Sequence, residues 1–215
     1  MNYATSSCCE TTDKHFSETH VSEKVRDYHR GKIHATTRML IAALRDAARE
    51  SDTIVDIGGG FGAIPLALLE DSRMDATLVD ISTAFLDAAR TEARERGVED
   101  RMTFIHGDAA ELPLPSIEGD IVVLDRVVCC YDDWQRLIDC STTACARTYA
   151  FTYPRDNWLV KLVTAFMNWR RARAGNEFRT HVHSVVLMDT AIQQAGFSRV
   201  ARSGTIAWEM ALYRR

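Results

Sequence analysis

The sequence predicts an α/β protein: a seven-stranded, mostly parallel sheet with helices on both faces and an antiparallel C-terminal strand. Two observations predict this fold. Short, almost continuously apolar segments alternate with segments whose apolar residues recur at helical spacing, which is the pattern of parallel strands buried on both faces. Near the C-terminus, two strand-like segments are separated only by Gly204, and a tight hairpin joins antiparallel strands.

The expected elements follow this alternation in order. Strands are expected at 53–57, 76–80, 102–106, 120–125, 148–153, 197–203 and 205–213, and helices at 16–31, 33–50, 63–70, 83–96, 133–146, 156–173 and 184–195. Residues 1–15 are polar and are expected to be loosely held. We divide the chain into an N-terminal tail and helical lid, residues 1–32, and a main domain, residues 33–215.

One helix raises a question of its own. Trp158, Phe166 and Trp169 recur at near-helical spacing. The favoured interpretation is an apolar stripe packed on the core, and the alternative is the wall of a flat hydrophobic acceptor pocket.

Composition excludes several classes of protein. The chain has 215 residues, 46% of them hydrophobic, and a net charge of -4, so no overall positive field favours nucleic acid. The N-terminus lacks the basic and apolar regions of a secretory signal, and no apolar run reaches the length of a membrane span. We therefore expect a soluble cytoplasmic protein that acts on a small molecule, with neither nucleic acid nor membrane as a partner. Oligomeric state is left open.

A glycine-rich loop follows the first strand, in the segment from Ile54 to Ala63. Glycines let the chain turn sharply and let a ligand approach the backbone. Read alone, the loop fits two cofactors. Gly58, Gly60 and Ala63 satisfy the dinucleotide fingerprint, whereas Gly58, Gly60 and Gly62 satisfy the loop of a methyltransferase.

Three acidic residues at successive strand ends shift this balance. Asp56 precedes the loop and suits a cationic amino-acid group better than an anionic pyrophosphate. Asp80 ends the second strand at the spacing of a ribose-binding acid. Asp108 follows the third strand and could accept a hydrogen bond from an adenine amino group. Each acid alone could equally cap a turn, but three at one sheet edge indicate a ligand site.

With these residues the sequence resembles the class I S-adenosylmethionine-dependent methyltransferases, which have a Rossmann-like fold, over roughly residues 33–213. The resemblance rests on the segments 55–62, 78–82, 107–109 and 120–125 and on the C-terminal hairpin. It implies S-adenosylmethionine as cofactor and in-line methyl transfer to a small acceptor. It also implies which residues bind the cofactor: Asp56, Gly58, Gly59, Gly60 and Gly62 at the methionine part, Asp80 and Ile81 at the ribose, Asp108 and Ala109 at the adenine, and Arg126 and Val127 facing the methionine part and the acceptor.

A narrower similarity is carried by residues 124–131, 152–155 and 177–183. They look like those of an uncharacterised bacterial methyltransferase group that often begins with a Cys-Cys pair. The layout after the fifth strand is also similar to that of the magnesium-protoporphyrin O-methyltransferases. The acceptor region varies most within this fold, so the second likeness says little about substrate.

Methyl transfer from a sulfonium needs alignment more than a catalytic group, and no catalytic signature is evident. The candidates are His34 in the N-terminal segment, Tyr131 after the fourth strand, and His183 beyond the long helix, the last on the family likeness alone. Any single histidine is more often a surface or capping residue. His181 and His183 together do not define a metal site, and none is expected.

The cysteines allow a further hypothesis. If the Cys8–Cys9 pair folded back near Cys129–Cys130, four thiols could serve a thiol- or metalloid-directed methyltransferase. The simpler interpretation is that Cys129 and Cys130 pack in the core. Two other functions stay open beside the methyltransferase: an NAD(P)-dependent oxidoreductase, and a non-catalytic cofactor-binding regulatory protein.

Overall fold

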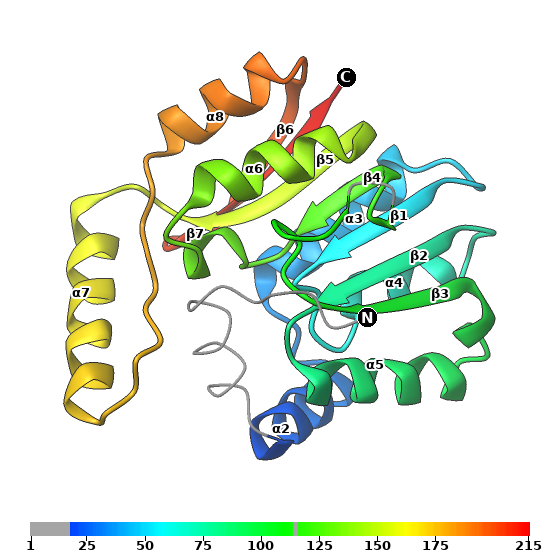
Figure 1. Cartoon of the computed structure of the whole chain (residues 1–215), viewed down its shortest axis with the longest axis horizontal. Helices are drawn as coiled ribbons and strands as arrows, with labels where there is room; N and C mark the ends of the chain where they lie inside the picture. Colours follow the sequence, from blue (N-terminus) through cyan, green and yellow to red (C-terminus); the bar gives the residue numbers. More distant parts are fainter. Residues whose placement is uncertain (1–17, 114–115) are drawn as a thin grey trace.

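The computed structural model describes residues 18–113 and 116–215 and shows one seven-stranded sheet (Figure 1). The strands lie in the order β3-β2-β1-β4-β5-β7-β6, and only the pairs that involve β7 are antiparallel. The predicted α/β class, with an antiparallel strand near the C-terminus, is therefore confirmed. The strands are β1 Thr53–Ile57, β2 Asp75–Asp80, β3 Met102–His106, β4 Gly119–Leu124, β5 Cys145–Pro154, β6 Ser198–Gly204 and β7 Trp208–Arg214.

Helices cover both faces of the sheet, as the buried strands require (Figure 1). The helices are α2 Glu18–His29, α3 Ala35–Ala47, α4 Ala63–Leu69, α5 Thr83–Glu95, α6 Trp134–Thr143, α7 Trp158–Arg173 and α8 Val185–Gln194, with short 3-10 turns η1 Glu99–Arg101 and η3 Val128–Cys130. Each matches an expected helix within a few residues at its ends. No helix in the described part of the chain is long and apolar enough to cross a bilayer.

Alternate side chains of the strands pack into two separate hydrophobic cores, one on each face of the sheet. On one face, Ile54 and Leu78 pack with residues of α3, α4 and α5 such as Leu40. On the other face, Val55 and its neighbours pack with α6 and α8. The period of two along each strand explains the division, because successive side chains point to opposite faces. The two cores fix the strand ends, and the loops that follow them, in a rigid frame.

The hairpin turn is longer than the sequence suggested. Gly204 lies inside the ladder, paired with Glu209, and the chain reverses over residues 205–207. A Cβ on Gly204 would lie 2.4 Å from the carbonyl oxygen of Trp208, so the glycine serves the close approach of two strands. The expectation that Gly204 alone forms the turn was wrong.

Helix α7 contradicts the expected core stripe. It has no buried residue, and Trp158, Phe166 and Trp169 are 76%, 56% and 54% exposed. The helix stands outside the layers of the sheet, at the left edge of Figure 1. Spacing identified the helix correctly but could not tell which way its apolar side faces.

Only some of the expectations for the N-terminal segment can be compared with the structure. The loosely held tail, Cys8 and Cys9 lie outside the described residues. Helix α2 packs beside α5, where Val21 is buried and the ring nitrogen Nε2 of His29 lies 2.8 Å from Glu92 Oε1. The division into residues 1–32 and 33–215 stays a prediction.

Candidate functional site

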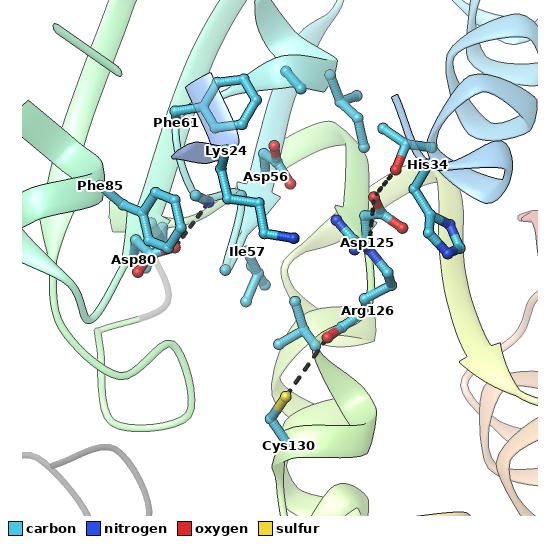
Figure 2. A pocket seen from close by; sticks show the side chains of 18 of the residues that line it. Lys24, His34, Asp56, Ile57, Phe61, Asp80, Phe85, Asp125, Arg126 and Cys130 are labelled. Atoms are coloured by element: carbon cyan, nitrogen blue, oxygen red, sulfur yellow. Dashed lines mark hydrogen bonds and ion pairs between the residues drawn. The ribbon is translucent and has the colours of Figure 1, made fainter. Parts of the chain in front are cut away.

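A cavity of about 510 Å³ opens where the parallel strands β1, β2 and β4 end. Its walls come from the loops after these strands, from the C-terminal half of α2, and from the α2–α3 connection with the first turn of α3. Figure 2 shows its principal side chains. Ligands bind at this edge of open α/β sheets, and the volume is typical of a small-molecule site.

The glycine loop forms one wall by bringing the backbone close to the cavity. Gly58, Gly60 and Gly62 all have positive φ, at 64°, 59° and 82°, a region that other residues enter only under strain. At Gly58 a Cβ would lie 2.6 Å from Val127 Cγ2, and at Gly59 it would lie 2.2 Å from Asp56 Oδ2. The loop therefore tolerates no side chain at these two positions.

Asp56 is the most unusual group of the cavity. It is fully buried at the end of β1, and neither carboxylate oxygen has a hydrogen-bond partner among the described residues. Burial raises the pKa of the Asp56 carboxyl well above its usual range, and the neighbouring carboxylates of Asp125 and Asp80 raise it further. A buried acid without a partner is costly, so its retention beside a cavity points to a cationic ligand.

Asp80 is held firmly at the end of β2. Its two carboxylate oxygens accept hydrogen bonds of 2.8 Å from the backbone N–H groups of Gly60 and Ser82. The carboxylate thus joins the glycine loop to the start of α5. The Asp80 side chain also lines the cavity.

Asp125 and Arg126 form a second charged group after β4. Asp125 accepts hydrogen bonds from the hydroxyls of Thr37 and Thr152, at 2.5 and 2.7 Å. Arg126 is the one described non-glycine residue with positive φ, 61°, and its N–H donates to Thr152 Oγ1 at 2.7 Å. Its Nε lies 3.6 Å from Asp125 Oδ2. Backbone strain of this kind gathers at functional sites, where the surroundings hold it.

His34 lines the cavity beside this group, at the N-cap of α3 (Figure 2). Its Nδ1 accepts from the N–H of Thr36 at 3.4 Å, so the neutral ring carries its proton on Nε2. Burial lowers the pKa of His34, and the positive charge of Arg126 lowers it further. In this state His34 can donate a hydrogen bond to a ligand.

Tyr131 and Asp108 are joined to each other. The Tyr131 hydroxyl donates to Asp108 Oδ1 in a short hydrogen bond, and the N–H of Ala110 donates to the same oxygen at 3.0 Å. Tyr131 and Ala109 line the cavity, whereas Asp108 is buried behind them. Asp108 thereby fixes the position of the Tyr131 side chain in the cavity wall.

His183 supports the site from outside the cavity. Its Nε2 lies 3.1 and 2.9 Å from the carbonyl oxygens of Val128 and Tyr131 and must donate to them, because carbonyls only accept. Its ring stacks on His181, whose N–H donates to the Cys129 carbonyl at 2.7 Å. Burial lowers the pKa of His183, which keeps this arrangement neutral. The two histidines hold the segment after β4.

The cysteines divide between core and cavity. Cys129 is buried, and Cys130 lines the cavity with its Sγ 3.8 Å from that of Cys129. Within residues 18–113 and 116–215, no three His, Cys, Asp or Glu side chains gather as they would around a metal ion. The thiol-directed hypothesis stays a prediction, since its other pair is not described.

Most of the residues proposed from sequence meet in this one cavity. Those that line it are Asp56, Gly58, Gly59, Gly60, Asp80, Ile81, Ala109, Arg126, Val127, His34 and Tyr131. Gly62, Asp108 and His183 do not line it. The ligand contacts assigned to these three residues, and to the eleven residues that line the cavity, stay predictions.

Sequence reasoning missed several lining residues, chiefly Lys24, Thr37, Phe85 and Asp125. The sequence did contain a signal for Asp125. It directly follows β4, and Asp56 and Asp80 occupy the equivalent positions at the ends of β1 and β2. No comparable signal marks Lys24, because only the packing of α2 brings it to the cavity (Figure 2).

Comparison with known proteins agrees with this geometry. Residues 55–146 match a family model described as a methyltransferase domain. The ubiquinone/menaquinone biosynthesis C-methyltransferase UbiE of Rhizobium meliloti (strain 1021) is 34% identical over 83 residues, 38% of this chain and 32% of that protein. The ribosomal protein L11 methyltransferase of Enterobacter sp. (strain 638) is 33% identical over 95 residues, 44% of this chain and 30% of that protein. The matched segment thus spans about a third of these relatives.

The fold likeness extends over nearly the whole chain. The magnesium protoporphyrin IX methyltransferase ChlM of Synechocystis PCC 6803, solved with bound S-adenosylhomocysteine, superposes with a TM-score of 0.76 at 17% identity. The superposition covers 97% of this chain and 99% of that one. The predicted resemblance to class I methyltransferases and the Rossmann-like fold are confirmed, and S-adenosylmethionine is the cofactor of that class. The matches favour neither the oxidoreductase nor the regulatory alternative.

Proposed function

We propose that this chain, which carries a class I methyltransferase domain, transfers a methyl group from S-adenosylmethionine to a small-molecule acceptor. The observation that carries the proposal is the buried carboxylate of Asp56, which has no hydrogen-bond partner among the described residues. It lies beside a glycine loop in which a Cβ at Gly58 or Gly59 would collide with its neighbours. The methionine part of the cofactor bears an ammonium group, which would pair with Asp56. An anionic pyrophosphate at this position would instead be repelled.

The other residues fit the rest of the cofactor. We assign the ribose hydroxyls to Asp80, whose orientation two backbone N–H groups fix. We assign the adenine to the wall formed by Ile81 and Ala109, with Asp108 behind it. When bound, S-adenosylmethionine supplies a methyl group activated by its sulfonium.

The acceptor then lies toward His34, Arg126 and Tyr131. His34 would donate a hydrogen bond through Nε2, and the strained backbone of Arg126 would direct its side chain along the cavity. His183 acts as a positioning residue, because its Nε2 is already engaged with the backbone after β4. These residues align the acceptor and exclude water, which are the main tasks of the protein in this reaction.

Helix α2 would act as a lid, since Lys24 and Tyr28 border the cavity from outside the sheet. Tyr28 packs edge-on against Phe61 of the glycine loop, at 5.1 Å between ring centroids. This contact would carry movements of α2 to the cofactor loop. We place the reaction in the cytoplasm, without nucleic acid as a partner.

Calorimetry with S-adenosylhomocysteine and with NADH tests the cofactor. Micromolar binding of S-adenosylhomocysteine and no binding of NADH is expected, and the reverse pattern would end the proposal. A second experiment tests turnover: transfer of a radiolabelled methyl group from S-adenosylmethionine across a panel of small hydroxylated, carboxylated and amine acceptors. Binding without transfer to any acceptor would favour the non-catalytic alternative.

A further inference from the structure

Helix α7 has its polarity reversed relative to an ordinary surface helix. The residues that face the rest of the protein are Val160, Thr164, Asn168 and Arg171, the only partly buried positions of the helix. Most of them are polar, and Asn168 exchanges two hydrogen bonds with the backbone of Thr180, at 2.8 and 3.0 Å. A surface helix normally turns its apolar side inward.

The outward side of α7 is broadly apolar. Seven large apolar residues are between 46% and 76% exposed: Trp158, Leu159, Leu162, Val163, Phe166, Met167 and Trp169. They recur at helical spacing and so form one continuous face. Contiguous exposed apolar surfaces of this kind mark sites of interaction with other molecules or with membranes.

The charge of α7 identifies what would cover this face. The helix contains four basic residues and no acidic one, in a chain whose net charge is -4. Lys161 pairs with Asp156 at 2.6 Å, but no carboxylate of the described residues pairs with the arginines of the last turn, Arg170, Arg171 and Arg173. Positive charge therefore gathers at the C-terminal end of the apolar face.

We propose that the outward face of α7 docks on the surface of an anionic lipid bilayer. Helices that lie in a membrane interface combine tryptophan, phenylalanine and leucine with arginine and lysine. Helix α7 carries the aromatic and aliphatic residues on its outward side and three arginines in its last turn, at the end of that side. Tryptophan also prefers the level of the lipid headgroups. A second copy of the chain fits less well, because two α7 helices of the same charge would meet with no acidic side chain between them.

The docking surface is joined to the cavity through the chain that follows it. Residues 174–184 return from α7, and there His181 and His183 hydrogen-bond to the backbone after β4. Tyr131 and Cys130 of that segment line the cavity. A bilayer that contacts α7 would thus lie close to residues 174–184, which hold the segment after β4 through His181 and His183. This reverses the expectation, drawn from sequence, that no membrane is a partner.

Flotation of the full chain with vesicles tests the proposal without reference to activity. Vesicles of phosphatidylcholine with about a third phosphatidylglycerol are compared with pure phosphatidylcholine at low and at physiological salt. Binding to the anionic vesicles that weakens with salt is expected, together with a blue shift of tryptophan emission. Absence of binding to anionic vesicles, or equal binding to both kinds, would overturn the proposal.

Two variants locate the contact. Leu162→Gln/Phe166→Gln removes exposed apolar side chains and is expected to lower vesicle partitioning roughly 10- to 100-fold. Arg170→Gln/Arg173→Gln should lower it about fivefold per arginine. Ile206→Gln is the matched control, because Ile206 is 87% exposed but lies in the β6–β7 turn. Unchanged binding by both double variants would refute the assignment to α7.

Sedimentation velocity of the same proteins, without lipid, distinguishes the rival occupant. A monomer at micromolar concentration supports the proposal. A dimer that the Leu162→Gln/Phe166→Gln variant dissociates would assign the face to a second copy and overturn it. Melting temperatures within about 2 °C of the parent are expected for all variants, because exposed substitutions change stability little.

Discussion

Replacing Asp56 by asparagine should move stability and cofactor affinity in opposite directions. In the free protein the Asp56 carboxylate is fully buried, has no partner among the described residues, and lies close to the carboxylates of Asp125 and Asp80. At pH values above the raised pKa of Asp56, Asp56→Asn removes this charge and keeps the shape. A buried unpaired charge costs about 1–3 kcal/mol or more, so the variant should be more stable by about that amount. For a chain of this length this is roughly 2–12 °C in Tm.

Cofactor binding should respond in the opposite way. The ammonium group assigned to Asp56 would lose a charge-assisted hydrogen bond, which is worth about 1.5–3 kcal/mol. Affinity for S-adenosylhomocysteine should therefore fall roughly 10- to 150-fold. Thermal denaturation without ligand and calorimetry with S-adenosylhomocysteine measure the two effects.

The pH dependence gives an independent check. Because the pKa of Asp56 is raised in the folded protein, Asp56 favours folding at pH values below its ordinary pKa of 3.8. This contribution is lost as the pH rises through the raised pKa. The ligand needs the ionised form, so affinity should increase with pH over the same range. Asp56→Asn should remove both dependences.

Asp52→Asn is the matched control. Asp52 is also buried, but it forms a salt bridge with Arg147 and accepts from the N–H of Arg49 at 2.6 Å. Its loss should lower stability by about 2 kcal/mol or more and leave the affinity unchanged. If Asp56→Asn behaved in the same way, Asp56 would be a structural residue and the reasoning would be refuted.

Three further predictions concern the rest of the site. Asp80→Ala should weaken S-adenosylhomocysteine binding by about 1–3 kcal/mol in calorimetry, and unchanged affinity would place Asp80 outside the site. Gly58→Ala should cost about 2–4 kcal/mol of stability in urea unfolding, because it adds a collision with Val127 to left-handed strain. Gly97 has a similar positive φ, and a Cβ added there would have no atom within 4 Å, so Gly97→Ala should lose only about 1 kcal/mol. Equal losses for the two variants would exclude the collision. Arg126→Gly should raise Tm by roughly 2–4 °C, because glycine adopts the left-handed conformation without strain. The same variant should slow methyl transfer. A lowered Tm would show that the Arg126 side chain contributes more to stability than its backbone strain costs.

Local sequence was sufficient for the sheet and for the cofactor end of the site. Buried strands such as Thr53–Ile57 are recognisable because their apolar residues are nearly continuous and are bounded by glycine or polar residues. Parallel strands bring their carboxyl ends to one edge, so the sequence alone predicts that Asp56 and Asp80 lie near each other. The resemblance to class I methyltransferases followed from these same residues.

Only the tertiary structure decided which side chains share the cavity and which merely support it. His183 was expected at the acceptor, but its Nε2 is engaged by two backbone carbonyls from a segment more than fifty residues away in sequence. Lys24 reaches the cavity only because α2 packs beside α5. Such long-range contacts leave no local periodicity.

Helix α7 shows the physical limit most clearly. The spacing of Trp158, Phe166 and Trp169 determined that they share one face of a helix, and this was right. Burial depends on where neighbouring elements lie, and the hydrogen bonds of Asn168 to Thr180 attach the polar side of the helix to the protein. The sequence by itself thus determined the helix, the sheet and the cofactor loop. The packing of elements distant in sequence decided that the apolar face of α7 points outward and that Asp56 has no hydrogen-bond partner among the described residues, because contacts of this kind depend on the whole fold.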